Sequence, residues 1–148
     1  MLRLTSTILI IVALFAVVLG AVYVARGALM PYHVDFLGES AMQAIDDNPD
    51  LATLTTVFVR LTGTLLFSAG ILLVAIIHYG LRKAQRWAWW ATFIGMGVVN
   101  GATAALTEPI GGFPWVLAIV LLIVFLAAIG LAAREVFKGV PGRSTAGA

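Results

Sequence analysis

The chain contains no cysteine. This absence excludes disulfide bonds, thiol catalysis, thiolate-held zinc, iron–sulfur clusters and dithiol–quinone exchange. Charge is also scarce, because only 11% of the 148 residues are charged, whereas a soluble domain carries about 25%. The 9 basic and 7 acidic residues give a net charge of +2, too weak and too scattered for a nucleic-acid interface. The composition therefore lies outside the soluble range and predicts no nucleic-acid partner.

What the chain has instead is long apolar runs, since 61% of its residues are hydrophobic. Four runs reach the about 20 residues that a helix needs to cross a bilayer core of about 30 Å: residues 4–25, 57–79, 87–106 and 113–133. Lipid offers the backbone no hydrogen-bond partners, and the runs lack the alternation of a transmembrane barrel, so each is expected to be helical. The sequence predicts a single domain over residues 1–148, an all-α bundle of four transmembrane helices with an outer loop at residues 26–56.

The first run follows Arg3 and in this respect is similar to a signal peptide. Its apolar stretch of 22 residues exceeds the usual length of about 7–15, and no small-x-small cleavage site follows it. We therefore expect the first run to be a retained membrane anchor.

The loops differ in charge. Basic residues lie at both ends of the chain and between the second and third runs: Arg3, Arg82, Lys83, Arg86, Arg134, Lys138 and Arg143. Acidic residues lie after the first run and in the last hairpin: Asp35, Glu39, Asp46, Asp47, Asp50 and Glu108. Because loops rich in Lys and Arg stay in the cytoplasm, both termini are predicted to be cytoplasmic. The excess of Arg over Lys and the abundance of Ala favour a GC-rich bacterium, and hence its inner membrane.

Two local patterns refine this layout. Apolar residues recur at helical spacing in the outer loop, which predicts a short amphipathic helix lying over the bundle. Asn48-Pro49-Asp50 is typical of a helix start, so the second helix is expected to span Pro49–Tyr79, about 46 Å, and to project beyond the membrane. The tryptophans of the Arg86–Trp90 stretch are expected to form an interfacial aromatic belt rather than a ligand cage.

Polar residues inside apolar runs are candidates for function, because they are costly in lipid. Arg60, Thr64 and Ser68 lie on one face of the second run. On the third run, one stripe leads to Glu108 and contains Thr92, Met96, Asn100, Thr103 and Thr107. One hypothesis is a structural clamp, in which Arg60 pairs with Glu108 or with an acid of the outer loop. The other is an outward-opening polar cavity lined by Thr64 and Ser68, with Arg60 as its anion or headgroup contact, Asn100 as its floor and Glu108 as its rim.

Small residues at intervals of four also mark two runs, and such spacing permits close approach of helix backbones. The clearer pattern is Gly97-x-x-x-Gly101-x-x-x-Ala105, and a weaker one is Ala16-x-x-x-Gly20. The partner of each face is either another helix of this chain or a second subunit.

No reactive pair points to catalysis. Ser68 has no acid or histidine nearby in sequence, and every carboxylate is expected outside the membrane or at its interface, which disfavours a proton-coupled pump. His33 and His78 are expected at opposite membrane faces, so one chain cannot supply both ligands of a haem. His33, Asp35 and Glu39 lack a fixed metal-ligand spacing. We expect no cofactor, no metal site and no enzyme activity.

Three short motifs resemble those of small four-helix bacterial membrane proteins of the DoxX-like kind: Met30-Pro-Tyr-His33, Val59-Arg60-Leu-Thr-Gly63 and Arg86-Trp-Ala-Trp-Trp90. The resemblance implies a four-helix fold, and DoxX-like proteins are associated with membrane redox complexes, although this chain carries no redox group. The sequence thus favours a non-catalytic accessory or assembly protein that packs against a membrane-protein partner or a second copy. The alternative is a protein that binds or transports a lipid or amphipathic small molecule in the outward cavity.

Overall fold

The computed structural model describes residues 1–138, and all its regular structure in that range is helical, as the sequence predicts. In chain order the elements are α1 (Leu2–Arg26), α2 (Pro31–Leu37), α3 (Glu39–Asp46), α4 (Pro49–Tyr79), the short 3₁₀ helix η1 (Leu81–Lys83), α5 (Arg86–Thr107) and α6 (Gly112–Phe137). Arg143, which contributed to the predicted orientation, lies outside the described residues.

Three stretches of helix are long and apolar enough to cross a membrane: Leu2–Arg26, Pro49–Lys83 and Gly112–Phe137. The chain is therefore a membrane protein by length and composition, and three of the four expected spans are supported. The remaining helix, α5, has 22 residues, about 33 Å, which is a sufficient length. Its hydropathy is lower than that of the other three, because Asn100 and several glycines, threonines and tryptophans interrupt its apolar residues.

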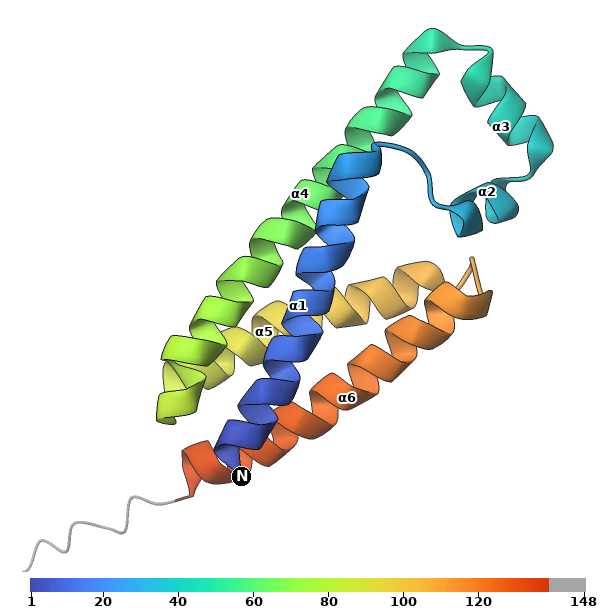
Figure 1. The fold of residues 1–148 in the computed structure, drawn as a ribbon. Helices are drawn as coiled ribbons and strands as arrows, with labels where there is room; N and C mark the ends of the chain where they lie inside the picture. Colours follow the sequence, from blue (N-terminus) through green and yellow to red (C-terminus); the bar gives the residue numbers. More distant parts are fainter. Residues whose placement is uncertain (139–148) are drawn as a thin grey trace, which may run out of the picture.

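The four long helices form two antiparallel pairs. Figure 1 shows α1 and α4 side by side over most of α1, while α5 and α6 make a second hairpin that diverges from α4 along its length. We call the end where α1 begins and η1 lies the basic end (Arg3, Arg82, Lys83, Arg86 and Arg134). The opposite end, with α2, α3 and the α5–α6 turn, is the acidic end (Asp35, Glu39, Asp46, Asp47, Asp50 and Glu108).

The main hydrophobic core lies in the half of the bundle nearest the basic end, where both pairs meet. Its fully buried side chains come from all four long helices and from η1: Leu9, Ile77, Leu81, Met96 and Phe125. A second, smaller cluster of Tyr23, Met30 and Val59 joins α1 to α4 near the acidic end. The main cluster joins all four long helices near the basic end, whereas the smaller cluster joins only α1 to α4, so the α5–α6 hairpin diverges toward the acidic end.

Close backbone approach holds α1 against α4. A Cβ atom added to Gly20 would lie 2.5 Å from the backbone nitrogen of Phe67 and 2.6 Å from the carbonyl oxygen of Gly63. A Cβ atom added to Gly70 would likewise lie 3.0 Å from the Ala13 carbonyl oxygen of α1. The partner of Gly20 is therefore a helix of the same chain.

The start of α4 agrees with the sequence prediction, since the helix spans Pro49–Tyr79. The Asn48 side-chain oxygen accepts hydrogen bonds from the backbone N–H groups of Asp50 and Leu51, at 3.1 and 3.2 Å. The outer loop differs from the single amphipathic helix expected. Gly38, with φ of 78°, interrupts the helix there, and the loop folds as the two short helices α2 and α3 (Figure 1).

Candidate functional site

Arg60 lies at the place where α1 ends. A Cβ atom on Gly27 would be 2.6 Å from Nε of Arg60, so the guanidinium rests against the backbone of Gly27. Gly27 terminates α1 in a left-handed conformation with φ of 59°, and its N–H donates to the Tyr23 carbonyl oxygen at 2.9 Å. A cation at this position is favoured by the negative end of the α1 dipole. The Arg60 guanidinium therefore lies at the C-terminal end of α1, a position that its spacing within α4 did not predict.

Thr64 and Ser68 do not face α5. Leu73 marks the side of α4 that does, because a Cβ atom on Gly95 of α5 would lie 3.2 Å from a Leu73 methyl carbon. At about 100° per residue, Ser68 is rotated by about 140° from Leu73 and Thr64 by about 180°. Both side chains are exposed, and the Thr64 hydroxyl donates to the Arg60 carbonyl oxygen at 2.9 Å.

The polar stripe of α5 does point toward the interior of the bundle. Thr92 and Met96 are fully buried, Asn100 is half-buried and Thr103 is exposed, so the stripe leaves the core as the hairpins diverge. The Asn100 amide nitrogen donates to the Met96 carbonyl oxygen at 2.8 Å, within its own helix. The Thr103 hydroxyl donates to the Val99 carbonyl oxygen at 2.7 Å. The Thr92 hydroxyl is the fully buried polar group of this stripe, and within residues 1–138 it has no hydrogen-bond partner.

Glu108 is exposed at the end of α5. Figure 1 shows the end of α5 well separated from the end of α1, where Arg60 lies. The five residues predicted to line one cavity thus occupy three places: Arg60 beside Gly27, Thr64 and Ser68 on the far side of α4, and Asn100 and Glu108 on α5. The structure does not bring them together.

An aromatic cluster at the acidic end, which the sequence analysis missed, forms a small cavity of about 180 Å³ between α1, α2 and α4. Tyr23, His33 and Thr62 supply its polar groups, and Phe58 and Val59 its apolar wall. The hydroxyls of Tyr23 and Tyr32 hydrogen-bond to each other. The signal available in the sequence was the position of Tyr23 near the end of the first run and of Tyr32-His33 just after it.

His33 has a defined protonation preference in this cluster. Its Nδ1 accepts a hydrogen bond from the Met30 backbone N–H at 3.2 Å, and its ring lies 4.2 Å from that of Tyr32, centroid to centroid. Burial lowers the pKa of His33 below its ordinary value. The neutral imidazole is therefore the form that holds the first turn of α2, with Nε2 carrying the proton.

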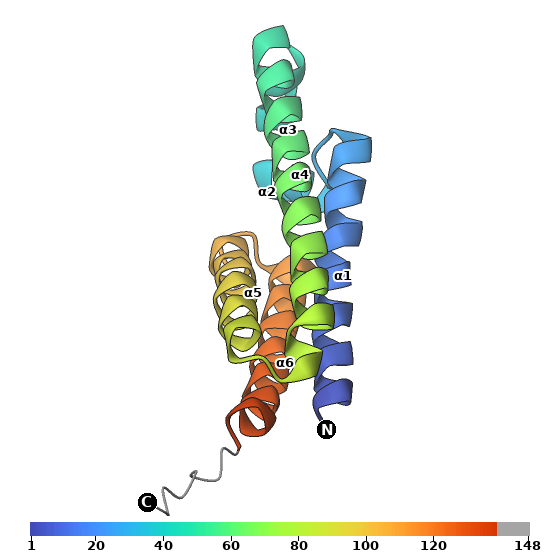
Figure 2. The ribbon, with the colours of Figure 1, turned by 90° about the vertical axis from the view of Figure 1, so that its left-hand side faces the viewer.

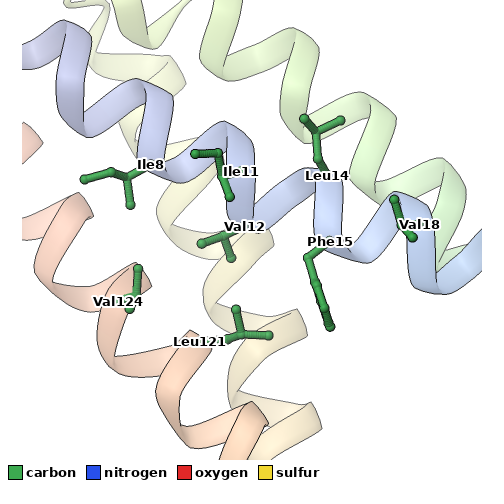
Figure 3. Close-up of a pocket in the computed structure, with 8 residues that line it drawn as sticks. All are labelled: Ile8, Ile11, Val12, Leu14, Phe15, Val18, Leu121 and Val124. Carbon is green, nitrogen blue, oxygen red and sulfur yellow. The ribbon is translucent and has the colours of Figure 1, made fainter.

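The volume of this cavity limits what it can hold. Pockets for drug-sized ligands occupy about 300–1,000 Å³, whereas this one has about 180 Å³. It has room for a few water molecules or one small polar group. A larger hollow of about 400 Å³ lies between α1 and α6, and its lining includes Ile11, Phe15, Leu121 and Val124 (Figure 3). Every residue that lines it is apolar, so it offers no polar group that would orient a ligand.

The small residues of α5 divide between two surroundings. A Cβ atom on Gly97 would meet the Phe125 ring of α6 at 3.8 Å, an ordinary contact inside the chain. A Cβ atom on Gly101 would have no atom within 4 Å from the described residues, apart from its own neighbours in α5. Ala105 is exposed. In α1, Gly20 is buried against α4 and Ala16 is half-buried. Only part of the small-residue pattern is therefore used within residues 1–138.

Trp89 has a structural role beyond the expected aromatic belt. Its indole Nε1–H donates to the Ile129 carbonyl oxygen of α6 at 3.0 Å. The indole also stacks on Phe93, with 5.2 Å between ring centroids and 7° between planes. Trp87 and Trp90 are exposed, and their place in an interfacial belt stays a prediction. Trp89 thus joins α5 to α6, which only its position in the fold reveals.

No protein-family model, curated protein or solved structure matches this chain. The resemblance to DoxX-like proteins accordingly stays a prediction from three short motifs.

Proposed function

We propose that this protein is a non-catalytic accessory or assembly subunit of a bacterial inner membrane. The observation that carries the proposal is an open face on α5, where the small residues Gly101 and Ala105 of the predicted pattern continue the line of Ile94 and Val98; we call these four positions the small-residue face. These positions repeat at intervals of four, three and four and so lie along one side of the helix. Ile94 is 59% exposed and Val98 is 65% exposed.

Close packing and interhelical hydrogen bonds drive helix association in lipid, because lipid tails are as apolar as the side chains. A helix with small residues therefore gains most from a partner that can approach its backbone. Gly20 and Gly63 have such a partner within the chain. The space next to the Gly101 Cα, by contrast, is left open by residues 1–138. The small-residue face is thus suited to a transmembrane helix of another protein or of a second copy.

A fourth span and a cytoplasmic location of both termini belong to the same proposal. α5 begins next to η1 at the basic end, ends next to α6 at the acidic end, and is antiparallel to α6 (Figure 2). If α4 and α6 cross the bilayer, α5 must return the chain across it between them. The positive charge of the basic end favours the cytoplasmic side for this end.

The test is Gly101→Leu, with Gly130→Leu as the matched control. Gly130 lies on α6, is exposed, and likewise has an open Cβ position with respect to the described residues. We expect Gly101→Leu to abolish co-purification of a membrane-protein partner, or the homodimer, in gently solubilised membranes analysed by native mass spectrometry. Gly130→Leu should retain the assembly. A bare monomer in the wild type, or equal assembly in both variants, contradicts the proposal.

Binding of a lipid or other amphipathic small molecule that inserts one small polar group into the cavity at Tyr23, His33 and Thr62 is the second candidate. We expect native mass spectrometry to find one small molecule retained per chain, and Thr62→Val to release it. Thr55→Val is the control, because Thr55 is on the same helix and its hydroxyl donates to the Leu51 carbonyl oxygen. Retention by both variants contradicts a ligand in this cavity.

A further inference from the structure

A polar pocket at the basic end lies apart from the small-residue face and from the Tyr23 cavity. Its volume is about 430 Å³, and it is lined by Arg3 and Thr7 of α1 and by Arg82 of η1. Figure 1 and Figure 2 both show the start of α1 beside the lower end of α4, from which η1 continues. Two guanidinium groups from distant parts of the sequence therefore border one hollow, and no acidic residue of the described chain belongs to its lining.

Two long hydrogen bonds between exposed side chains orient Arg82 at this pocket. One Nη of Arg82 donates to the Thr7 hydroxyl oxygen at 3.3 Å, and the other donates to His78 Nδ1 at 3.4 Å. The Thr7 hydroxyl in turn donates to the Arg3 carbonyl oxygen at 2.9 Å. A guanidinium has five N–H donors in a planar fork. With two of them engaged, Arg82 keeps three for a ligand.

The other charged groups at this end are placed differently. Arg86 lies over the ring of Phe137, 5.6 Å from its centroid, in a cation–π contact. Lys83, Arg134 and Glu135 are exposed and do not line the pocket. The charge of the pocket is therefore positive, and the amino-terminal dipole of the 25-residue α1 adds to it.

We propose that this pocket binds a phosphate group, and that the phosphate belongs to the headgroup of an anionic phospholipid. Paired guanidinium forks match the tetrahedral oxygens of phosphate, and a threonine hydroxyl can add a further hydrogen bond. The pocket lies where α1 begins and α4 ends, which is the level of the headgroups for helices that span a bilayer. Basic pockets between transmembrane helices on the cytoplasmic side are known to bind anionic headgroups. Free phosphate has the same chemistry and is the second source.

The experiment measures lipid retention in neutral detergent by native mass spectrometry, with phosphatidylglycerol titrated against a phosphatidylcholine background. We expect the wild type to retain one phosphatidylglycerol per chain. Arg82→Gln should weaken this binding by about tenfold, as expected for the loss of one charge-assisted hydrogen bond. Arg82→Lys should weaken it too, because lysine keeps the charge and loses the fork.

Lys83→Gln is the matched control, since it removes the same charge from the same short helix without touching the pocket. Its affinity should stay within about twofold of the wild type. Equal losses in Lys83→Gln and Arg82→Gln, or full affinity in Arg82→Lys, would mean diffuse surface attraction and overturn the proposal. Equal retention of phosphatidylcholine and phosphatidylglycerol, without phosphate binding, overturns it as well.

Two further arms complete the design. In the first, inorganic phosphate is added at increasing concentration. If phosphate displaces phosphatidylglycerol and raises the melting temperature of the protein as much as phosphatidylglycerol does, the pocket is a phosphate site and its ligand is free phosphate. Arg3→Gln covers the case in which Arg82→Gln fails to fold. The Arg3 side chain lines the pocket, while its structural hydrogen bond to Thr7 uses the backbone carbonyl. A folded Arg3→Gln variant that retains the lipid as the wild type does overturns the proposal.

Discussion

A methyl group at position 20 has no room between α1 and α4. The substitution Gly20→Ala would place its Cβ 2.5 Å from a backbone nitrogen and 2.6 Å from a backbone oxygen of α4. To reach an ordinary contact of 3.4 Å, the helices must separate by about 0.9 Å at this level. Backbone atoms cannot rotate away as a flexible side chain can, so the strain is relieved only by moving the whole helix.

The expected cost follows from two opposing terms. Alanine is favoured over glycine in a helix by about 1 kcal/mol. Overpacking in a filled interior costs about 1–3 kcal/mol, and a gap of 0.5–1 Å forfeits about a quarter to a half of each contact's attraction. Because the obstacle here is backbone, we take the upper end of that range. Gly20→Ala should therefore lower the free energy of unfolding by about 2 kcal/mol.

Gly130→Ala isolates the steric term. It has the same change of residue type in a long apolar helix, at a position where the described residues leave the Cβ site open. The difference between the two variants removes the propensity term and should be about 3 kcal/mol. The assay is reversible unfolding in mixed micelles by sodium dodecyl sulfate, followed by circular dichroism and tryptophan fluorescence. If Gly20→Ala proves as stable as Gly130→Ala, the inferred close approach of α1 and α4 is refuted.

Two other predictions use the same preparation. Trp89→Phe removes the hydrogen-bond donor to the Ile129 carbonyl oxygen and should lower the free energy of unfolding by about 1 kcal/mol. Trp90→Phe, at an exposed position, should lower it by almost nothing. Equal decreases in the two variants would contradict a stabilising role of this hydrogen bond. Burial lowers the pKa of His33 below 6.5, so the folded state favours the neutral imidazole. The contribution of this preference to the stability of the fold is complete above pH 6.5 and is lost as the pH falls toward the lowered pKa. Hydrogen-exchange protection of α2 should thus decrease from about pH 7.5 to about pH 5. It should be independent of pH in His33→Phe, and a wild type without pH dependence would contradict the inference.

Local signals were enough to predict the helices. The apolar runs at residues 4–25 and 113–133 correspond to α1 and α6 within a few residues, because about 20 apolar residues in lipid leave the backbone no alternative to a helix. The start of α4 was predicted to the residue, since Asn48 and Pro49 act through their own neighbours. The helix break at Gly38 was missed, because a glycine inside an apolar pattern does not by itself indicate a positive φ.

The candidate sites were predicted less well, because they depend on helix rotation. Soluble helices reveal their buried side by a polar opposite face, whereas α1, α4 and α6 are predominantly apolar, and the few polar residues of α4 do not indicate which of its sides is buried. Thr64 and Ser68 were therefore expected to face a shared cavity, and the structure has them on the side of α4 away from α5. The backbone of Gly63, which lies next to Thr64 in the sequence, instead packs closely against Gly20 of α1.

The sequence by itself determined a helical membrane protein with a basic and an acidic end, since hydropathy, charge and capping act over a few residues. Only the tertiary structure decided which side chains meet. Arg82 lies 75 residues from Thr7, and Arg60 reaches Gly27 across the α1–α4 contact. Such contacts depend on how two helices are rotated and on how closely they approach. Packing between small side chains and the backbone sets both. No local pattern along one helix contains that information.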